Sequence, residues 1–104
     1  MKYVKIPKSY KVGGAKVQVN NVERCSDNSL GECCLGAGSI EIAEKFCKDD
    51  VQSQGSKENT FYHELTHSIL RTMGEFELNE NEKFVCCFSG FLTEALEKAY
   101  FRED

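Results

Sequence analysis

The chain of 104 residues contains only two histidines and one proline, and no apolar run approaches the roughly 20 residues of a membrane span. The N-terminus has no apolar segment typical of a signal peptide, so we expect a cytoplasmic protein. No Cys-x-x-Cys pattern occurs, which argues against a zinc knuckle and a thioredoxin-type motif. The length predicts a single domain, residues 1–104, with one hydrophobic core.

Strong positive charge is also missing. The formal net charge is −4, and no dense cluster of Lys and Arg stands out from it. We therefore expect neither nucleic acid nor a membrane surface as a partner.

Cysteine, by contrast, is plentiful. In a reducing compartment we expect all six to be free thiols, some of them packed as small core residues: Cys25, Cys33, Cys34, Cys47, Cys86 and Cys87. We expect Cys86 and Cys87 to pack in a helix core beside Phe88. The alternative is a redox- or metal-responsive regulator, because the vicinal pairs Cys33-Cys34 and Cys86-Cys87 could bind a soft metal.

The first half of the chain has the alternating pattern of strands. Residues 10–24 alternate apolar and polar residues around Gly13-Gly14, which predicts a hairpin. Residues 32–43 read as two short strands that turn at residues 36–38. The segment of residues 44–57 is polar and irregular.

From residue 57 the apolar period changes to that of a helix. Tyr62, Leu65, Ile69 and Met73 fall on one arc, which predicts a core face, and Gly74 should end the helix. A second helix is expected at residues 80–100, with Asn79 as its N-cap. Its apolar stripe is predicted to contain Val85, Phe88, Leu92, Ala95, Leu96 and Ala99.

Strands followed by helices predict an α+β domain, with an N-terminal antiparallel or mixed β-sheet. In the second helix Phe84, Phe91 and Phe101 cannot all face one core, which hints at a weak homodimer.

Both histidines lie in the segment HELTH, residues 63–67. Residues four apart on a helix share one face, so the imidazoles of His63 and His67 can converge on one metal ion. Glu64 lies about 100° away from His63 around the helix. It is poorly placed as a ligand of that ion but can reach a water that the ion holds, where a general base is needed.

A zinc ion held by two histidines needs at least one further protein ligand and an open position for water. Carboxylates follow in the segment EFELNENEKFV, and Glu82 falls in line with the inward face of the second helix. Glu82 is thus the predicted third ligand and Glu80 the second choice. Alternatively, Glu82 is a capping-box residue three positions after Asn79.

The segments FYHELTHSILRTMG and LNENEKFVCCFSGFL resemble those of the short, gluzincin-like zinc metallopeptidases often encoded by bacteriophages and mobile elements. The order of strands before the HExxH helix is similar as well, so the resemblance covers nearly the whole chain. It implies a small zincin-like domain in which one Zn²⁺ ion is bound by His63, His67 and Glu82. Glu64 would be the catalytic acid and base in the hydrolysis of a peptide or protein substrate.

The resemblance also implies an extended peptide bound along an edge strand, expected here at residues 39–43. Tyr62 is the one candidate to stabilise the oxyanion, although its position on the helix is that of a core residue. Without such a group the chain could instead be a weakly active or inactive zincin-fold binding module that engages a partner protein.

Overall fold

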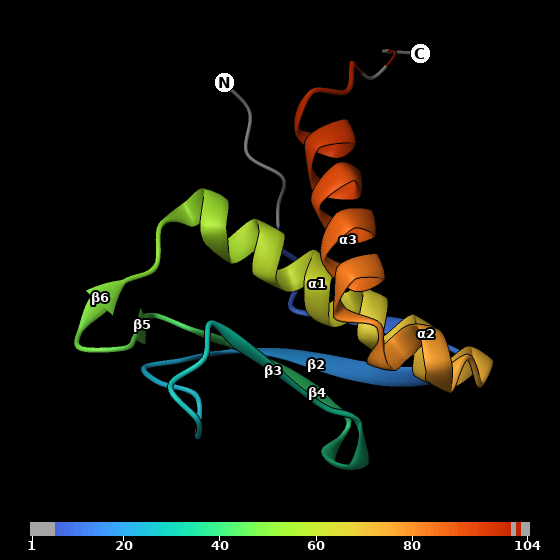
Figure 1. Ribbon diagram of the computed structural model, residues 1–104, viewed down its shortest axis with the longest axis horizontal. Helices are drawn as coiled ribbons and strands as arrows, with labels where there is room; N and C mark the ends of the chain where they lie inside the picture. Colours follow the sequence, from blue (N-terminus) through green and yellow to red (C-terminus); the bar gives the residue numbers. More distant parts are fainter. Residues whose placement is uncertain (1–5, 101, 103–104) are drawn as a thin grey trace.

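The computed structural model describes residues 6–100 and 102. A mixed β-sheet comes first and helices follow, which confirms the α+β class. The elements are β1 (Ser9–Val12), β2 (Ala15–Val22), β3 (Gly31–Cys34), the 3₁₀ turn η1 (Leu35–Ala37), β4 (Ser39–Ala43), β5 (Lys45–Phe46), β6 (Asp50–Val51), α1 (Gln54–Met73), α2 (Phe76–Glu80) and α3 (Glu82–Glu97). Figure 1 shows α1 lying across the sheet, with α3 standing steeply against α1.

The predicted hairpin is confirmed. β1 and β2 pair antiparallel with Val12 opposite Ala15, which leaves Gly13 and Gly14 as a two-residue turn. Both glycines have positive φ, 59° and 82°, as a type I′ turn requires. This turn twists with the strands and therefore fixes their register.

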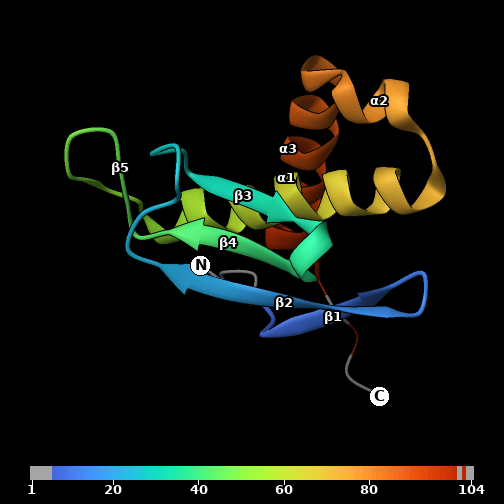
Figure 2. The same cartoon turned by 90° about the horizontal axis from the view of Figure 1, so that it is seen from below.

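The four-stranded sheet has the order β1-β2-β4-β3. β4 pairs in parallel with β2 and antiparallel with β3 (Figure 2). The predicted edge strand, residues 39–43, is therefore wrong: it is the interior strand β4, and the edge strand beside α1 is β3. Three side chains of β4, Ile40, Ile42 and Ala43, have no exposed surface, which suits an interior strand. No local pattern in the sequence shows that β4 pairs with the distant strand β2.

The core lies between the sheet and α1. It is built from Val17, Ile40 and Ile42 of the sheet and from Phe61 and Tyr62 of α1. Burial of Tyr62 was predicted, and Leu65 packs against this core.

Ile69 and Met73 do not belong to the core, contrary to prediction, because both are exposed. α1 contacts the sheet on one side and α3 on another. Burial therefore follows these two contact surfaces rather than one apolar arc. The buried residues of α1 include the polar Thr66 and Ser68.

The ends of α1 are defined by local caps. The Ser53 side chain accepts a hydrogen bond from the backbone N–H of Ser56, so α1 begins at Gln54 and not at the predicted Lys57. Gly74 ends α1 in the left-handed conformation with φ 79°, as predicted.

The second predicted helix is divided in two. α2 ends at Glu80, and Asn81, not Asn79, is the N-cap of α3, where its side chain accepts from the backbone N–H of Phe84 at 3.1 Å. The extended backbone of Asn81 (φ −85°, ψ 90°) interrupts the helical path. Glu82 is thus the first residue of α3, and the predicted capping box with Asn79 does not form.

The predicted apolar stripe of α3 is only partly buried. Val85 is fully buried, and Leu92 and Leu96 pack against the core, whereas Phe88 and Ala95 are exposed. α3 ends at Glu97, so Ala99 lies beyond it.

Free thiols, as expected, are Cys25, Cys34, Cys47, Cys86 and Cys87. Cys25 is buried, whereas Cys86 and Cys87 are exposed, so the prediction that these two pack in a helix core is wrong. None of the helices in the described part of the chain combines the length and the apolar character needed to cross a bilayer.

Candidate metal centre

Two histidines and a carboxylate meet where α1 faces the first turn of α3. The rings of His63 and His67 lie one helical turn apart, with centroids separated by 4.9 Å. The Glu82 carboxylate lies between them: Oε2 is 3.5 Å from His63 Nε2, and Oε1 is 3.2 Å from His67 Nε2. The structure therefore brings together the three residues that the sequence predicted as metal ligands.

The spacing of the Glu82 carboxylate from each histidine matches the coordination shell of a small cation. Ligand nitrogen and oxygen atoms about 2.0–2.1 Å from a tetrahedral zinc lie roughly 3.3 Å from one another. The two measured N···O separations, 3.5 and 3.2 Å, bracket that value. Glu82 thus lies at ligand spacing from each histidine, but the compact group of ligand atoms contains His63, Glu82 and Cys86 without His67, so the two rings would have to move closer together to share one ion.

His67 is oriented by a residue that sequence reasoning assigned elsewhere. Its Nδ1 lies 2.7 Å from the Asn79 side-chain oxygen, an acceptor, so Nδ1 carries the proton. In the neutral ring the lone pair is then on Nε2, which faces Glu82. Metal-binding histidines are commonly oriented by such a partner on the other ring nitrogen. Asn79 lies in α2, the short helix between α1 and α3.

His63 is also held in a form that can bind a metal. Burial lowers its pKa, and the neighbouring His67 lowers it further, while Glu82 opposes the shift. His63 is therefore neutral at pH 7, with a free lone pair on one nitrogen. The Sγ atom of Cys86, one turn after Glu82, lies 3.9 Å from His63 Nδ1.

Cys86 is a further potential ligand of this centre, whereas the sequence suggested it only as a soft-metal ligand paired with Cys87. Ligand atoms of His63, Glu82 and Cys86 all lie within 4.8 Å of one another. Cys86 follows Glu82 by four residues and so lies on the same flank of α3, which faces His63. This spacing is the signal in the sequence that could have identified Cys86 as a ligand. A second group of this kind, Glu32, Cys34 and Glu41, lies on β3 and β4 and contains no histidine.

Glu64 occupies a different environment from Glu82. It is only 8 % exposed, whereas the Glu82 side chain is 64 % exposed. Burial raises the pKa of Glu64 to about 7; His67 lowers it, and the carboxylate of Glu82 adds to the rise. A carboxyl group with a pKa near neutrality can both accept and return a proton at physiological pH.

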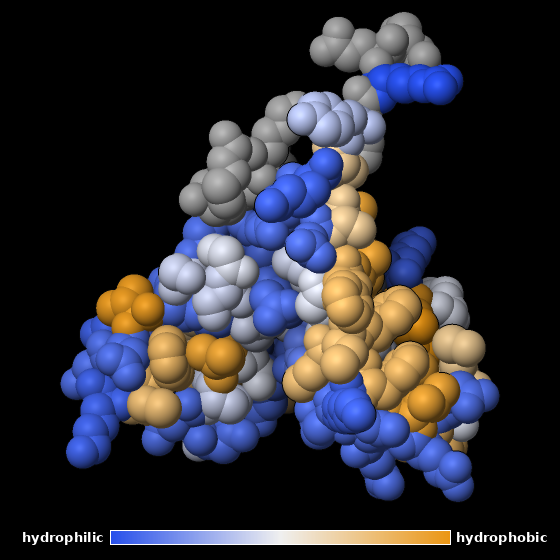
Figure 3. All heavy atoms as spheres, turned by 45° about the horizontal axis from the view of Figure 1, so that its top comes forward, coloured by the Kyte–Doolittle hydropathy of each residue, from blue (hydrophilic) through white to orange (hydrophobic). Residues whose placement is uncertain are grey.

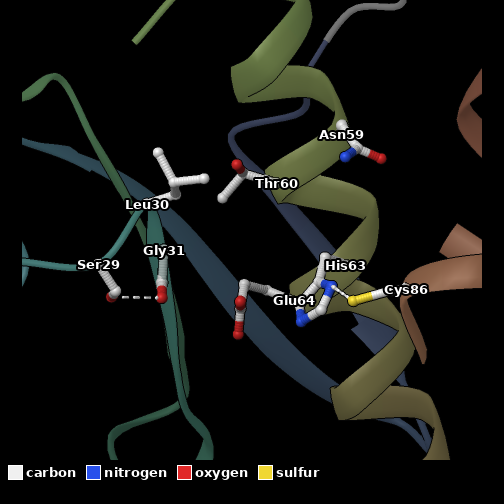
Figure 4. Close-up of a pocket in the computed structure, with 8 residues that line it drawn as sticks. All are labelled: Ser29, Leu30, Gly31, Asn59, Thr60, His63, Glu64 and Cys86. Carbon is white, nitrogen blue, oxygen red and sulfur yellow. Dashed lines mark hydrogen bonds between the residues drawn. The ribbon is translucent and has the colours of Figure 1, made fainter. Parts of the chain in front are cut away.

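Glu64 and His63 face a groove of about 470 Å³ between α1 and β3. Figure 4 shows both side chains on α1, with Gly31 at the start of β3 and Leu30 just before it on the facing side, and with Cys86 entering from α3. A side chain at residue 31 would collide with Thr60, whose Cγ2 atom would lie 2.4 Å from the added Cβ. Glycine at this position therefore allows β3 to run close to α1 beside Glu64.

Two predicted alternatives lie away from this centre. Glu80, the second choice for third ligand, is exposed at the last residue of α2, and Glu82 makes the contacts with the histidines. Tyr62, the candidate for the oxyanion, belongs to the core, where it packs edge-on against Phe61 with ring centroids 5.0 Å apart. Tyr62 is therefore not an oxyanion donor, and its position on the helix already indicated this.

Comparison of the chain with protein-family models, with curated proteins and with solved structures finds no match in any of the three. The arguments for function therefore depend on the geometry of this site and on the resemblance of its motif.

Proposed function

We propose that the protein is a zinc-dependent peptidase in which His63, His67 and Glu82 bind one zinc ion and Glu64 is the general acid and base. The observation that carries the proposal is the contact of His67 with Glu82. With Nδ1 held by Asn79, the ring of His67 directs its Nε2 at a carboxylate oxygen of Glu82 3.2 Å away. A contact of this kind needs positive charge between the two atoms, either the proton of an imidazolium ring or a metal ion, and only a metal ion can be shared with His63 as well.

The chemistry of these residues fits zinc. Two imidazoles and one carboxylate are typical ligands of catalytic zinc sites, which keep a fourth position for water. Bound there, the ion would lower the pKa of a water molecule to about 7 and polarise the carbonyl of a substrate.

Glu64 supplies the proton transfers. It follows His63 directly in α1 and lines the groove in which a peptide would lie. As base, its carboxylate accepts a proton from the attacking water, and as acid it returns the proton to the leaving amine. A pKa of about 7 suits both steps.

The substrate class follows from the edge of the sheet. β3 is the last strand of the sheet and borders the groove, so a peptide can add to it as a further antiparallel or parallel strand. Main-chain hydrogen bonds to β3 would hold an extended backbone next to Glu64 largely independently of its side chains. We therefore propose an extended segment of a peptide or protein as the substrate.

The decisive experiment combines metal analysis with cleavage of a peptide library. The wild-type chain should hold one zinc per molecule and cleave peptides, and Glu82→Ala should lose zinc. Glu80→Ala, two positions away and exposed, is the matched control and should keep it. Glu64→Gln should keep zinc and lose turnover. A chain that binds no zinc, or a Glu64→Gln variant that still cleaves, would overturn the proposal.

A binding module is the second candidate, favoured by the burial of Tyr62 away from the groove. Without a donor for the oxyanion, turnover depends on the metal and Glu64 alone. In this case the same groove and strand edge would hold a partner segment without cutting it. Stoichiometric zinc with no cleavage across the library, together with saturable peptide binding, would identify this function.

A further inference from the structure

α3 has an apolar face that nothing in the described structure covers. The buried residues of α3, which packs against α1, are Val85, Ser89 and Thr93. Two of these three are polar, yet Phe88 and Phe91 of the same helix are 49 % and 71 % exposed. Leu92 and Leu96 pack against the core, but these two phenylalanine rings lie outside while Ser89 and Thr93 are buried, which is unusual for the largest apolar residues of a helix.

The half-buried Phe84 and the exposed Phe88, Phe91 and Ala95 form a regular stripe, which we call the phenylalanine stripe. They follow one another at intervals of four, three and four residues, which is the spacing of a helix that packs along another helix. At 100° per residue they fall within an arc of about 60°. The rings of Phe84 and Phe88 are stacked, with centroids 5.8 Å apart.

α1 extends this surface. Ile69 and Met73 line a shallow groove of about 170 Å³ together with Phe84 and Phe88. Figure 3 shows a broad hydrophobic area over this side of the molecule. From their exposed fractions, four side chains (Ile69, Met73, Phe88 and Phe91) present roughly 400 Å² of apolar surface. This is already in the range of the largest apolar patches on monomers.

The area also fits an interface. Interfaces are about 60 % apolar, so 400 Å² of apolar surface corresponds to roughly 700 Å² of total area per partner. A standard interface buries about 800 Å² per partner. The exposed area is therefore close to that of a standard interface, and one partner could cover the whole stripe.

We propose that the occupant is a second copy of this chain, packed through antiparallel α3 helices about a two-fold axis. The spacing of the stripe is symmetric about the midpoint between Ser89 and Gly90. A two-fold axis there exchanges the position of Phe84 with that of Ala95, and Phe88 with Phe91. Each end then sets one ring against one methyl group, and the centre sets rings against rings. The stripe therefore pairs with an identical stripe running in the opposite direction, as the interface of an isologous dimer requires.

The charges at the two ends of α3 are complementary in the same register. Lys98 is exposed after the end of α3, and the two-fold places it opposite the position of Asn81 in the partner, next to Glu80. Each end of the helix pair thus sets a cation beside a carboxylate. Opposite charges at a rim favour this orientation, although they add little affinity.

The dimer leaves the candidate metal centre open. Around α3, the centre of the phenylalanine stripe lies about 170° from Cys86, which lines the groove of the metal site. Glu82 also lies on the other flank of the helix, where it meets the histidines. The dimer therefore requires neither the zinc nor the proposed peptidase activity, and its test is independent of both.

The first test is the molar mass of the full chain between about 1 and 500 μM, measured by sedimentation equilibrium in reducing buffer. The wild type should show a reversible monomer–dimer equilibrium. Phe91→Asp should raise the dissociation constant at least about 30-fold, because it buries an unpaired charge in the interface. Val51→Asp is the matched control, since Val51 in β6 is 70 % exposed and lies outside the stripe. Circular dichroism verifies the fold of each variant.

The second test addresses the register. Ala95→Phe should weaken the dimer because it places two rings opposite each other at each end. Adding Phe84→Ala to that variant exchanges the two sizes and should restore association at least in part. A wild type that stays monomeric at all concentrations would overturn the dimer, including the case in which it binds lipid vesicles instead. A dimer unaffected by Phe91→Asp would overturn this surface.

Discussion

The buried carboxyl group of Glu64 gives a sharp prediction for the metal-free protein. Its pKa is raised from 4.5 to about 7 in the folded chain, first because burial disfavours the charged form. The folded state therefore binds more protons than the unfolded state between pH 4.5 and 7. The stabilising contribution of the neutral carboxyl is fully present below pH 4.5 and is lost as the pH rises through 7.

The size of the effect follows from the shift. A difference of about 2.5 pH units corresponds to about 3 kcal/mol at 1.36 kcal/mol per unit. Glu64 is almost completely buried, so solvent screens little of this. Glu64→Gln keeps the shape of the side chain and removes its charge. At pH 8 the free energy of unfolding should therefore rise by about 3 kcal/mol relative to the wild type, and near pH 4.5 the difference should be close to zero.

Urea unfolding followed by circular dichroism, with chelator and reductant present, measures this difference from pH 4.5 to 8. The lowered pKa of His63 gives an opposite slope just below pH 6.5, because burial favours its neutral form. This contribution is common to both proteins and largely cancels in their difference. Glu80→Gln, at an exposed site, should give a profile parallel to that of the wild type. Parallel profiles for Glu64→Gln as well would refute the argument from burial.

Three further predictions concern the metal and the backbone. Asn79→Ala should lower zinc affinity about 10–100-fold, as measured by competition with a chromogenic chelator, because His67 loses the partner that fixes its tautomer; Asn21→Ala, on the exposed surface of β2, should leave the affinity unchanged. Gly31→Ala should destabilise the fold by about 1–3 kcal/mol in urea titrations, because the added Cβ would lie 2.4 Å from a Thr60 methyl group, whereas Gly55→Ala, with open space around it, should be neutral or stabilising. Removal of zinc with a chelator should lower the midpoint of thermal unfolding, and addition of zinc should raise it in proportion to the logarithm of its concentration.

Much of the fold could be predicted because its signals are local. The alternation of residues 10–24 and the pair Gly13-Gly14 predict a hairpin, and the structure has it with a type I′ turn. Gly74 marked the end of α1 for a similar reason, since only a residue that tolerates positive φ suits that cap. Each of these features depends on a few neighbouring residues.

The errors in the fold concern contacts between distant segments. No local pattern shows that β4 pairs with β2, and so residues 39–43 were assigned to the edge of the sheet instead of its interior. The apolar arc of α1 predicted burial of Ile69 and Met73, but the helix contacts both the sheet and α3 with other faces. An amphipathic pattern predicts one buried face, and α1 has two.

The part of the candidate site that lies on α1 could be predicted from the sequence. The spacing of His63 and His67 placed both rings on one face of α1, and the structure has them there. Glu82 was chosen by extending the inward face of the second helix backward, and it reaches the histidines even though that helix begins two residues later than predicted.

Asn79 shows why the rest of the site was beyond the sequence. Two asparagines, Asn79 and Asn81, are each a reasonable N-cap, and which of them caps α3 depends on where α2 stops. Because the chain breaks at Asn81, Asn79 is released from capping and its side chain can accept a hydrogen bond from His67. The same break makes Glu82 the first residue of α3, where its carboxylate can reach both rings. A single helix over residues 80–100, capped by Asn79, would have engaged this asparagine in its own backbone. The short α2 is therefore what allows the third ligand and the partner of His67 to come from adjoining elements.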